Sequence, residues 1–447
     1  MNAQHQDRPP EGSLTRDLLH LASGCLLGAV AATLVFQVVG TQEEADVRRY
    51  REARNFILSS YVEPLEAQEV VDLALSGMVD SLDSYSQYYD RQEIAALSRD
   101  TSGVYRGLGV VFAPIDPLGQ ILFALPDSPA DQAGLGVGDR LLLAEGQEVA
   151  SLEMPDLRSI LSTERREPLQ LRIRAPDGSE RDVEVLTREL VDPTVRHARM
   201  LPGDRGLGYL AITSFSQKTP TEFDDAVEVL EEQGLRGLVL DLRGNLGGVL
   251  SSSVEVANRF LSEGLVVSHE GRDESVIFRA DPDQASLEGL PLAILVDEES
   301  ASASEVLAAA LQEHRVAVIV GSPTYGKGMV QQVRTLSDNQ GVIKLTTAYY
   351  YTPSHRNIER TVAEAWDWGL RPDLQVELSD LEARLIHAHL GTYSPPNSSL
   401  AALQAWEDSL DVDLVRTHPA DAQLDAAVTL LEGQRPGAWR IEAPDAP

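Results

Sequence analysis

The segment DEESASASEVLAAALQEH, residues 297–314, has three serines within five positions, directly before a helical pattern. The apolar run PLAILVD before it predicts a buried strand, and the helix is expected to begin near Ala303, so Ser302 lies at the strand-to-helix junction. The free amides and positive dipole end of a helix can hold an oxyanion, which favours a nucleophilic serine there. Ser302 followed by Glu305 is equally a capping box, in which the hydroxyl only accepts a backbone N–H.

A serine nucleophile needs a base, and His269, His314 and His355 lie in no recognisable triad motif. A lysine can serve if burial lowers its pKa from about 10.4 toward neutrality, at a cost of about 4 kcal/mol. Lys327 is the candidate, because it follows the apolar strand VAVIV in GSPTYGKGMVQQV and has a glycine on each side. A loop lysine is otherwise solvated, so Lys327 alone does not establish a catalytic pair.

A nucleotide-binding site is the competing interpretation of the same loop. GSPTYGKG matches the GxxxxGK pattern, and the strand in GLVLDLRG ends at Asp241, as in proteins that bind magnesium nucleotides. However, Gly328 stands where the metal needs a Ser or Thr hydroxyl, and MVQQVRTL predicts a strand instead of a phosphate-holding helix. The acidic strand also precedes the glycine loop, the reverse of the usual order, so this interpretation is disfavoured.

The elements that must position these residues form an α/β multidomain chain. Residues 43–100 follow a helical pattern, and residues 103–188 contain short β-rich runs punctuated by glycines. From residue 206 strands alternate with helices, which predicts a substantially parallel sheet. After about residue 380 the chain is helical and irregular, with DAQLDAAVTLLEG as its clearest amphipathic segment.

Residues 18–39 form one long apolar run that is long enough to span a bilayer. Arg8 and Arg16 precede it and TQEEAD follows, so the short N-terminus is expected in the cytoplasm and the rest outside. LASGC suggests a lipoprotein acylated at Cys25 as an alternative. The run continues more than ten residues beyond that cysteine, which favours a retained signal anchor.

Composition excludes several classes of protein. The chain of 447 residues has 70 acidic and 37 basic residues, and the net charge of −33 argues against nucleic acid as a partner. A single cysteine excludes an internal disulfide framework and a zinc site built on several thiolates.

The blocks SGVYRGLGV, GLGVGDRLLLAEGQEV, GLVLDLRGNLGG, SASASEVLAAALQ, VGSPTYGKGMVQ and GLRPD occur in the order typical of one family. Over residues 45–380 the chain resembles the carboxy-terminal processing, or tail-specific, proteases, which are serine peptidases with a Ser–Lys pair. The resemblance implies Ser302 as nucleophile, Lys327 as general base and Gln331 as the residue that orients the lysine. It implies an oxyanion hole built from the amide of Ala303 and one amide from GNLGG, with Gly248 as the first candidate and Gly247 as the second. Leu246 stands where the family usually has proline, as does Ser84 in LDSYS.

Residues 103–188 resemble a PDZ domain. Its RGLGV loop is expected to receive a peptide C-terminus, with the candidate residues Arg106, Gly107, Leu108, Gly109 and Val110. The expected domains are a cytoplasmic N-terminus at 1–17, a transmembrane signal anchor at 18–39, a helical region at 43–100, the PDZ domain at 103–188, an α/β protease core at 190–380 and a C-terminal helical region at 381–447.

The sequence therefore predicts a single-pass inner-membrane serine endopeptidase, with its catalytic part in the periplasm or extracytoplasmic space, that cleaves proteins near their free C-termini. No metal and no cofactor is implied. Pairing of subunits into a homodimer through the terminal helical regions is an expectation from the family, and an adaptor or activator protein is left open. The alternative is a catalytically silent PDZ scaffold that binds C-termini without cutting them.

Overall fold

The computed structural model divides after Ser81 into two compact units. It describes residues 45–91, 93–94, 101–113, 118–162, 167–203, 205–337, 340–362, 368–393, 395–410 and 420–432. The predicted anchor at 18–39 and Cys25 lie outside these residues. Among the helices of the described ranges, none is long and apolar enough to cross a membrane.

The described part of the first unit is a pair of helices, α2 (Ala45–Ser60) and α3 (Ala67–Asp80). Helix α2 buries no side chain, and α3 buries Val70 and Val79. The helical pattern predicted for this region therefore forms helices.

The β-rich region is built from short antiparallel pairs. Its elements are β2 (Val104–Gly107), β3 (Val110–Phe112), β4 (Ile121–Ala124), α5 (Pro129–Gln132), β5 (Arg140–Ala144), β6 (Gln147–Glu148), α6 (Met154–Ser162), β7 (Leu169–Arg174), β8 (Glu180–Val185) and β9 (Arg188–Val191). Strand β7 shows why these segments are strands: Leu169, Leu171 and Ile173 point inward while the residues between them are exposed. Strand β9 pairs with β2, so this region continues to Val191.

A six-stranded sheet forms the centre of the α/β region, in the order β10-β11-β12-β15-β16-β19. Its strands are β10 (Val195–Met200), β11 (Leu207–Ile212), β12 (Gly237–Asp241), β15 (Leu292–Val296), β16 (Ala317–Gly321) and β19 (Leu374–Gln375). Strands β11 to β19 are parallel, and only β10 runs against them. This agrees with the predicted alternation of strands and helices.

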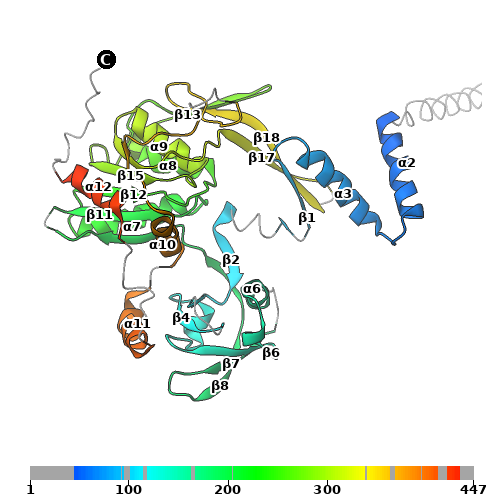
Figure 1. Ribbon diagram of the computed structural model, residues 1–447, viewed down its shortest axis with the longest axis horizontal. Helices are drawn as coiled ribbons and strands as arrows, with labels where there is room; N and C mark the ends of the chain where they lie inside the picture. Colours follow the sequence, from blue (N-terminus) through cyan, green and yellow to red (C-terminus); the bar gives the residue numbers. More distant parts are fainter. Residues whose placement is uncertain are drawn as a thin grey trace, which may run out of the picture. The chain divides into compact units, whose positions relative to one another are not determined.

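Both faces of this sheet are apolar, so helices cover both (Figure 1). Alternate residues of β12 show the two faces: Leu238 and Leu240 join one cluster, and Val239 joins the other. Helices α7 (Thr219–Glu232), α8 (Leu250–Asn258) and α9 (Ala303–Glu313) pack on the first face. Helices α10 (Asp380–Leu390) and α12 (Ala422–Leu431) pack on the second.

A second sheet is antiparallel in all its strand pairs, with the order β1-β18-β13-β14 and β17 paired to β18. Its strands are β1 (Gln87–Asp90), β13 (Leu265–Gly271), β14 (Ser275–Arg279), β17 (Met329–Thr335) and β18 (Gly341–Tyr351). The run GVIKLTTAYYY falls within the alternation of strands and helices predicted from residue 206, but it is β18 and belongs to this second sheet. Its eleven residues have partners along both edges, so β18 is the central strand here.

Helix α11 (Asn397–Leu410) lies against the β-rich region. Leu403 is buried with Leu122 and Phe123 of β4, and Trp406 packs beside them. The C-terminal helices thus contact both parts of the second unit: α10 and α12 lie on the central sheet, and α11 on the β-rich region.

Candidate active site

Ser302 occupies a sharp turn between β15 and α9, within the serine loop (residues 297–302). Its backbone φ of 57° is in the left-handed region, and its side chain is nearly buried. A non-glycine residue in a disfavoured conformation costs about 1–3 kcal/mol and persists where the surroundings enforce it. The predicted strand, junction and helix start at Ala303 are all present.

Glu305 holds this turn and also the lysine loop (residues 322–328). Its Oε2 accepts the amides of Ser302 and Lys327, each at 2.8 Å. Its Oε1 accepts the Gly326 amide at 2.7 Å and the Thr324 hydroxyl at 2.5 Å. Burial raises the pKa of Glu305, although these four hydrogen bonds favour the charged form. The bond from the Ser302 amide to Glu305 is the glutamate half of the predicted capping box, whereas the Ser302 side chain makes no cap hydrogen bond. The glutamate also has a further role that the sequence did not indicate.

A second buried carboxylate, Glu359, holds the backbone directly after Lys327. It accepts the amide of Gly328 at 3.0 Å, together with the amide and hydroxyl of Thr361. The amides of residues 326, 327 and 328 thus all donate to buried carboxylates. Glu359 was not among the predicted site residues, because the only signal for it was its position in the block that ends with GLRPD.

The Lys327 ammonium lies 4.8 Å from the centre of the Tyr85 ring and is mostly buried. Burial lowers the pKa of Lys327, and Lys344 lowers it further, whereas the nearby carboxylates Glu359 and Glu305 oppose the change. A lowered pKa is what a lysine needs in order to act as a base. Tyr85 was also missed, although its block LDSYS had been noted.

Gln331 lies on β17, directly after an irregularity in the pairing with β18. Its side-chain amide donates to the Thr346 hydroxyl at 3.3 Å, which in turn donates to Asp83 at 3.1 Å. Hydrogen bonds to Ser86 and to backbone amides outweigh burial and lower the pKa of Asp83. Gln331 is therefore held by a polar chain that reaches the segment before β1.

Among the described residues, no hydrogen bond joins the side chains of Ser302, Lys327 and Gln331 to one another. The neighbour of the Ser302 hydroxyl is Tyr350, whose pKa burial raises to about 12 and the serine hydroxyl partly lowers. Catalytic hydrogen bonds are often long before substrate binds and tighten in the complex.

The glycine loop (residues 242–249) lies against Ser302. A Cβ on Gly247, whose φ is 99°, would lie 2.8 Å from Ser302 Cβ, so only glycine fits. The Gly247 amide donates to the Asn245 side chain at 2.9 Å, and the Asn245 carbonyl accepts the Ala301 amide at 3.0 Å. The amides of Gly248 and Ala303 donate to no residue in the described ranges. These two amides are available to an oxyanion, and the amide of Gly247 is occupied.

The RGLGV loop lines a cavity of about 350 Å³ in the β-rich region. Apolar side chains of β3 and α6 form its walls, with Arg158 of α6 also lining it and Arg106 paired to Glu189 at 3.5 Å. Gly109 has a φ of 77°, which brings the loop close to Ser128. The five predicted residues 106–110 therefore surround one cavity, which has room for a short peptide end.

In the described ranges, no group of three or more His, Cys, Asp or Glu side chains is placed to hold a metal ion.

Comparisons with known proteins match both parts of the second unit. Residues 206–376 match the model of peptidase family S41, and residues 124–174 match that of the PDZ domain. A carboxyl-terminal-processing protease of Synechocystis sp. is 31% identical over 379 residues, which cover 83% of this chain and 79% of that protein. A carboxy-terminal-processing protease of Bartonella bacilliformis is 29% identical over 373 residues, covering 81% and 83%. The solved structure of the photosystem II D1 C-terminal processing protease is 27% identical, covers 82% of this chain and 97% of that one, and gives a TM-score of 0.42.

Proposed function

The chain belongs to peptidase family S41, the carboxy-terminal-processing serine proteases, and on that basis we propose that Ser302 and Lys327 carry out its catalysis. We also propose that the catalytic part lies outside the cytoplasm and is attached to the membrane by an N-terminal anchor. The chain is a mixed α/β serine-type endopeptidase with a PDZ domain, and its substrates are proteins or peptides.

One observation carries the assignment of Ser302 and Lys327. A single oxygen atom of the buried Glu305 accepts the backbone amides of both residues. The nucleophile and the base are thereby fixed to one rigid point, although 25 positions separate them in the sequence. Preorganisation of this kind is what acyl transfer requires.

The reaction begins when the neutral Lys327 amine takes the proton of the Ser302 hydroxyl as its oxygen attacks the scissile carbonyl. The amides of Ala303 and Gly248 hold the negative oxygen of the tetrahedral intermediate. Lys327 then gives the proton to the leaving amine of the substrate, and an acyl-enzyme remains. The neutral amine of Lys327 next takes a proton from the water that hydrolyses the acyl-enzyme and releases the product. Gln331 orients the lysine amine after exchanging its present partner Thr346.

The PDZ cavity supplies the preference for C-termini. Residues 106–110 present backbone amides to a terminal carboxylate, and the peptide adds as a strand along β3. Capturing the free end first restricts cleavage to the part of the substrate that reaches Ser302.

The membrane anchor is proposed from residues 18–39, whose apolar run and preceding arginines favour a retained signal anchor. The catalytic part would then lie in the periplasm or extracytoplasmic space. Fractionation of cells, followed by protease accessibility of the tagged C-terminus in spheroplasts, tests this orientation.

The catalytic assignment is tested with the full-length chain in detergent and an unstructured protein substrate. Wild type should produce new C-termini detectable by mass spectrometry, and Ser302→Ala and Lys327→Ala should not, with Ser409→Ala, an exposed serine of α11, as the serine control. Undiminished cleavage by either catalytic variant excludes the mechanism. Binding of peptides without cleavage by the wild type would indicate a silent PDZ scaffold instead.

A further inference from the structure

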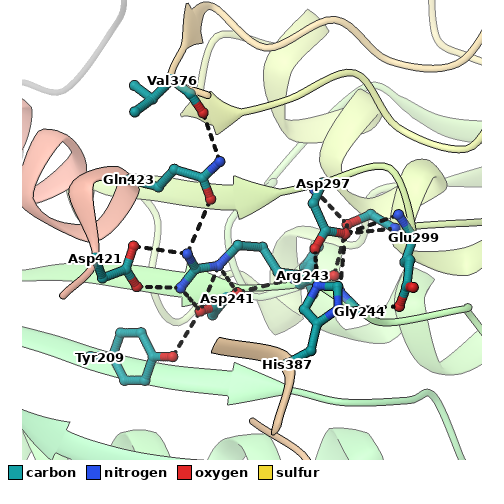
Figure 2. Close-up of polar contacts among 12 residues, drawn as sticks. Tyr209, Asp241, Arg243, Gly244, Asp297, Glu299, Val376, His387, Asp421 and Gln423 are labelled. Carbon is teal, nitrogen blue, oxygen red and sulfur yellow. Dashed lines mark hydrogen bonds and ion pairs between the residues drawn. The ribbon is translucent and has the colours of Figure 1, made fainter. Parts of the chain in front are cut away.

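A polar network outside the reacting groups joins the C-terminal helices to the loops of the active site (Figure 2). One half centres on Arg243, which pairs with Asp241 and Asp421 at 2.6 Å each and is almost fully buried. Gln423 of α12 joins it at 3.1 Å. The other half centres on Asp297 at the end of β15, and its partner is His387 of α10.

Asp297 connects the two loops that flank Ser302. Its Oδ1 accepts the Gly244 amide of the glycine loop at 3.0 Å. The same atom accepts the amides of Glu299 and Ser300 in the serine loop, each at 3.1 Å. The carboxylate is buried, so its orientation sets the spacing between the loop that carries the nucleophile and the loop that carries the Gly248 amide.

His387 holds the other oxygen of this carboxylate. Its Nε2 lies 2.5 Å from Asp297 Oδ2, and its Nδ1 lies 3.5 Å from Glu299. The ring also packs over Gly244, where an added Cβ would lie 3.5 Å from the ring carbon Cδ2. One imidazole on α10 thus contacts both loops, from a helix 85 residues beyond the nucleophile.

We propose that His387 is a positioning residue for the reaction, and that α10, by placing its imidazole on Asp297, sets the geometry between the serine loop and the glycine loop. The proposal rests on the proposed function of Ser302. It makes the C-terminal helical region part of the catalytic apparatus, so that undocking of α10 would lower turnover without removing a reacting group.

The charge of His387 gives this role a pH signature. Asp297 raises the pKa of His387 through their hydrogen bond, Glu299 adds to the effect and Arg243 opposes it. Burial raises the pKa of Asp297, but the hydrogen bonds from His387 and the Gly244 amide outweigh it and lower that pKa. The ion pair therefore exists between the two pKa values. It is lost as pH rises through the raised pKa of His387, and also as pH falls through the lowered pKa of Asp297.

The test compares His387→Ala and His387→Gln with His389→Ala in the full-length chain in detergent. His389 is the matched control because it lies on the same helix but stacks on His197, with ring centres 4.5 Å apart. We expect His387→Ala to lower kcat about tenfold to hundredfold with KM little changed, since small displacements of reacting groups cost that much. His387→Gln should recover part of kcat and abolish the decline at alkaline pH, because its amide donates a hydrogen bond without titrating.

Hydrogen–deuterium exchange provides a readout that needs no turnover. Peptides that cover residues 243–249 and 297–304 should exchange faster in His387→Ala than in wild type, and should be unchanged in His389→Ala. Unaltered exchange in both loops, or a wild-type kcat and pH profile in a folded His387→Ala, would overturn the proposal. If the wild type cleaves nothing, the proposed function fails, and exchange alone still decides whether His387 holds the loops.

Discussion

Replacing Glu305 with glutamine tests whether one buried carboxylate joins the nucleophile to the base. The two oxygens of Glu305 accept four hydrogen bonds, and no water-exposed surface remains on the side chain. An amide keeps only one strong acceptor. In its better orientation it retains the amides of Ser302 and Lys327, but its NH2 group faces the Gly326 N–H and the Thr324 hydroxyl loses its acceptor.

Two buried donors are then unsatisfied, at about 1–3 kcal/mol each, so the free energy of unfolding should fall by about 2–6 kcal/mol. Because the displaced segment carries Lys327, kcat should fall more than KM rises. Urea unfolding followed by tryptophan fluorescence measures the first effect, and cleavage kinetics on the folded fraction measure the second.

The chain offers a matched control, because Ser379 and Glu382 form the same motif at the start of α10. There the glutamate is partly exposed, and within the described residues it accepts only the Ser379 amide and hydroxyl. Glu382→Gln should therefore be nearly neutral, since water replaces the lost acceptor. A Glu305→Gln variant as stable and as active as Glu382→Gln would refute the reasoning.

Three further outcomes are expected. Burial lowers the pKa of Lys327 in the folded chain below its ordinary value of 10.5. Between the folded and the unfolded pKa of this lysine the unfolded chain binds more protons, so the free energy of unfolding rises with pH there. Lys327→Met should therefore abolish cleavage yet raise the melting temperature, most at acidic pH. Gly247→Ala should lower kcat by about a hundredfold or more, because its Cβ would displace Ser302, while peptide binding measured by calorimetry stays unchanged. Amidating the C-terminus of a peptide substrate should weaken its binding about tenfold or more, since a charge-assisted hydrogen bond is lost, and equal binding of both peptides would count against the PDZ cavity as the carboxylate site.

The parts that the sequence could predict are those set by local pattern. The strand before Ser302, the helix from Ala303 and the central strand ending at Asp241 follow from short apolar runs and a capping motif. Burial on both faces of a parallel sheet gives such strands a near-continuous apolar sequence, which is easy to recognise. The positions of the site residues within these elements could therefore be predicted without any tertiary contact being known.

The contacts that hold the site could not be predicted in this way, because they join distant segments. Glu359 reaches Gly328 across 31 positions, and His387 reaches Asp297 across 90. Nothing in the local sequence of α10 distinguishes a histidine that binds a carboxylate from one on the surface. The strand β18 lies in a separate antiparallel sheet, where β17 is its neighbour in the chain but β1 and β13 are distant, and local pattern does not show to which sheet such a strand belongs.

The two capping boxes show where local pattern stops carrying functional information. Ser302 with Glu305 and Ser379 with Glu382 have the same spacing and the same bond from the serine amide to the glutamate, at 2.8 Å in both. They differ in the serine and in their surroundings. Ser302 has a φ of 57° and its side chain makes no cap hydrogen bond, whereas Ser379 has a φ of −68° and its hydroxyl accepts the Glu382 amide. Glu305 is closed off by the lysine loop, and Glu382 is partly exposed. Since a buried carboxylate must find partners and an exposed one need not, burial converts a common helix start into a junction between nucleophile and base. The geometry of the proposed catalytic pair thus depends on the packing around α9, because that packing keeps Glu305 buried between Ser302 and Lys327.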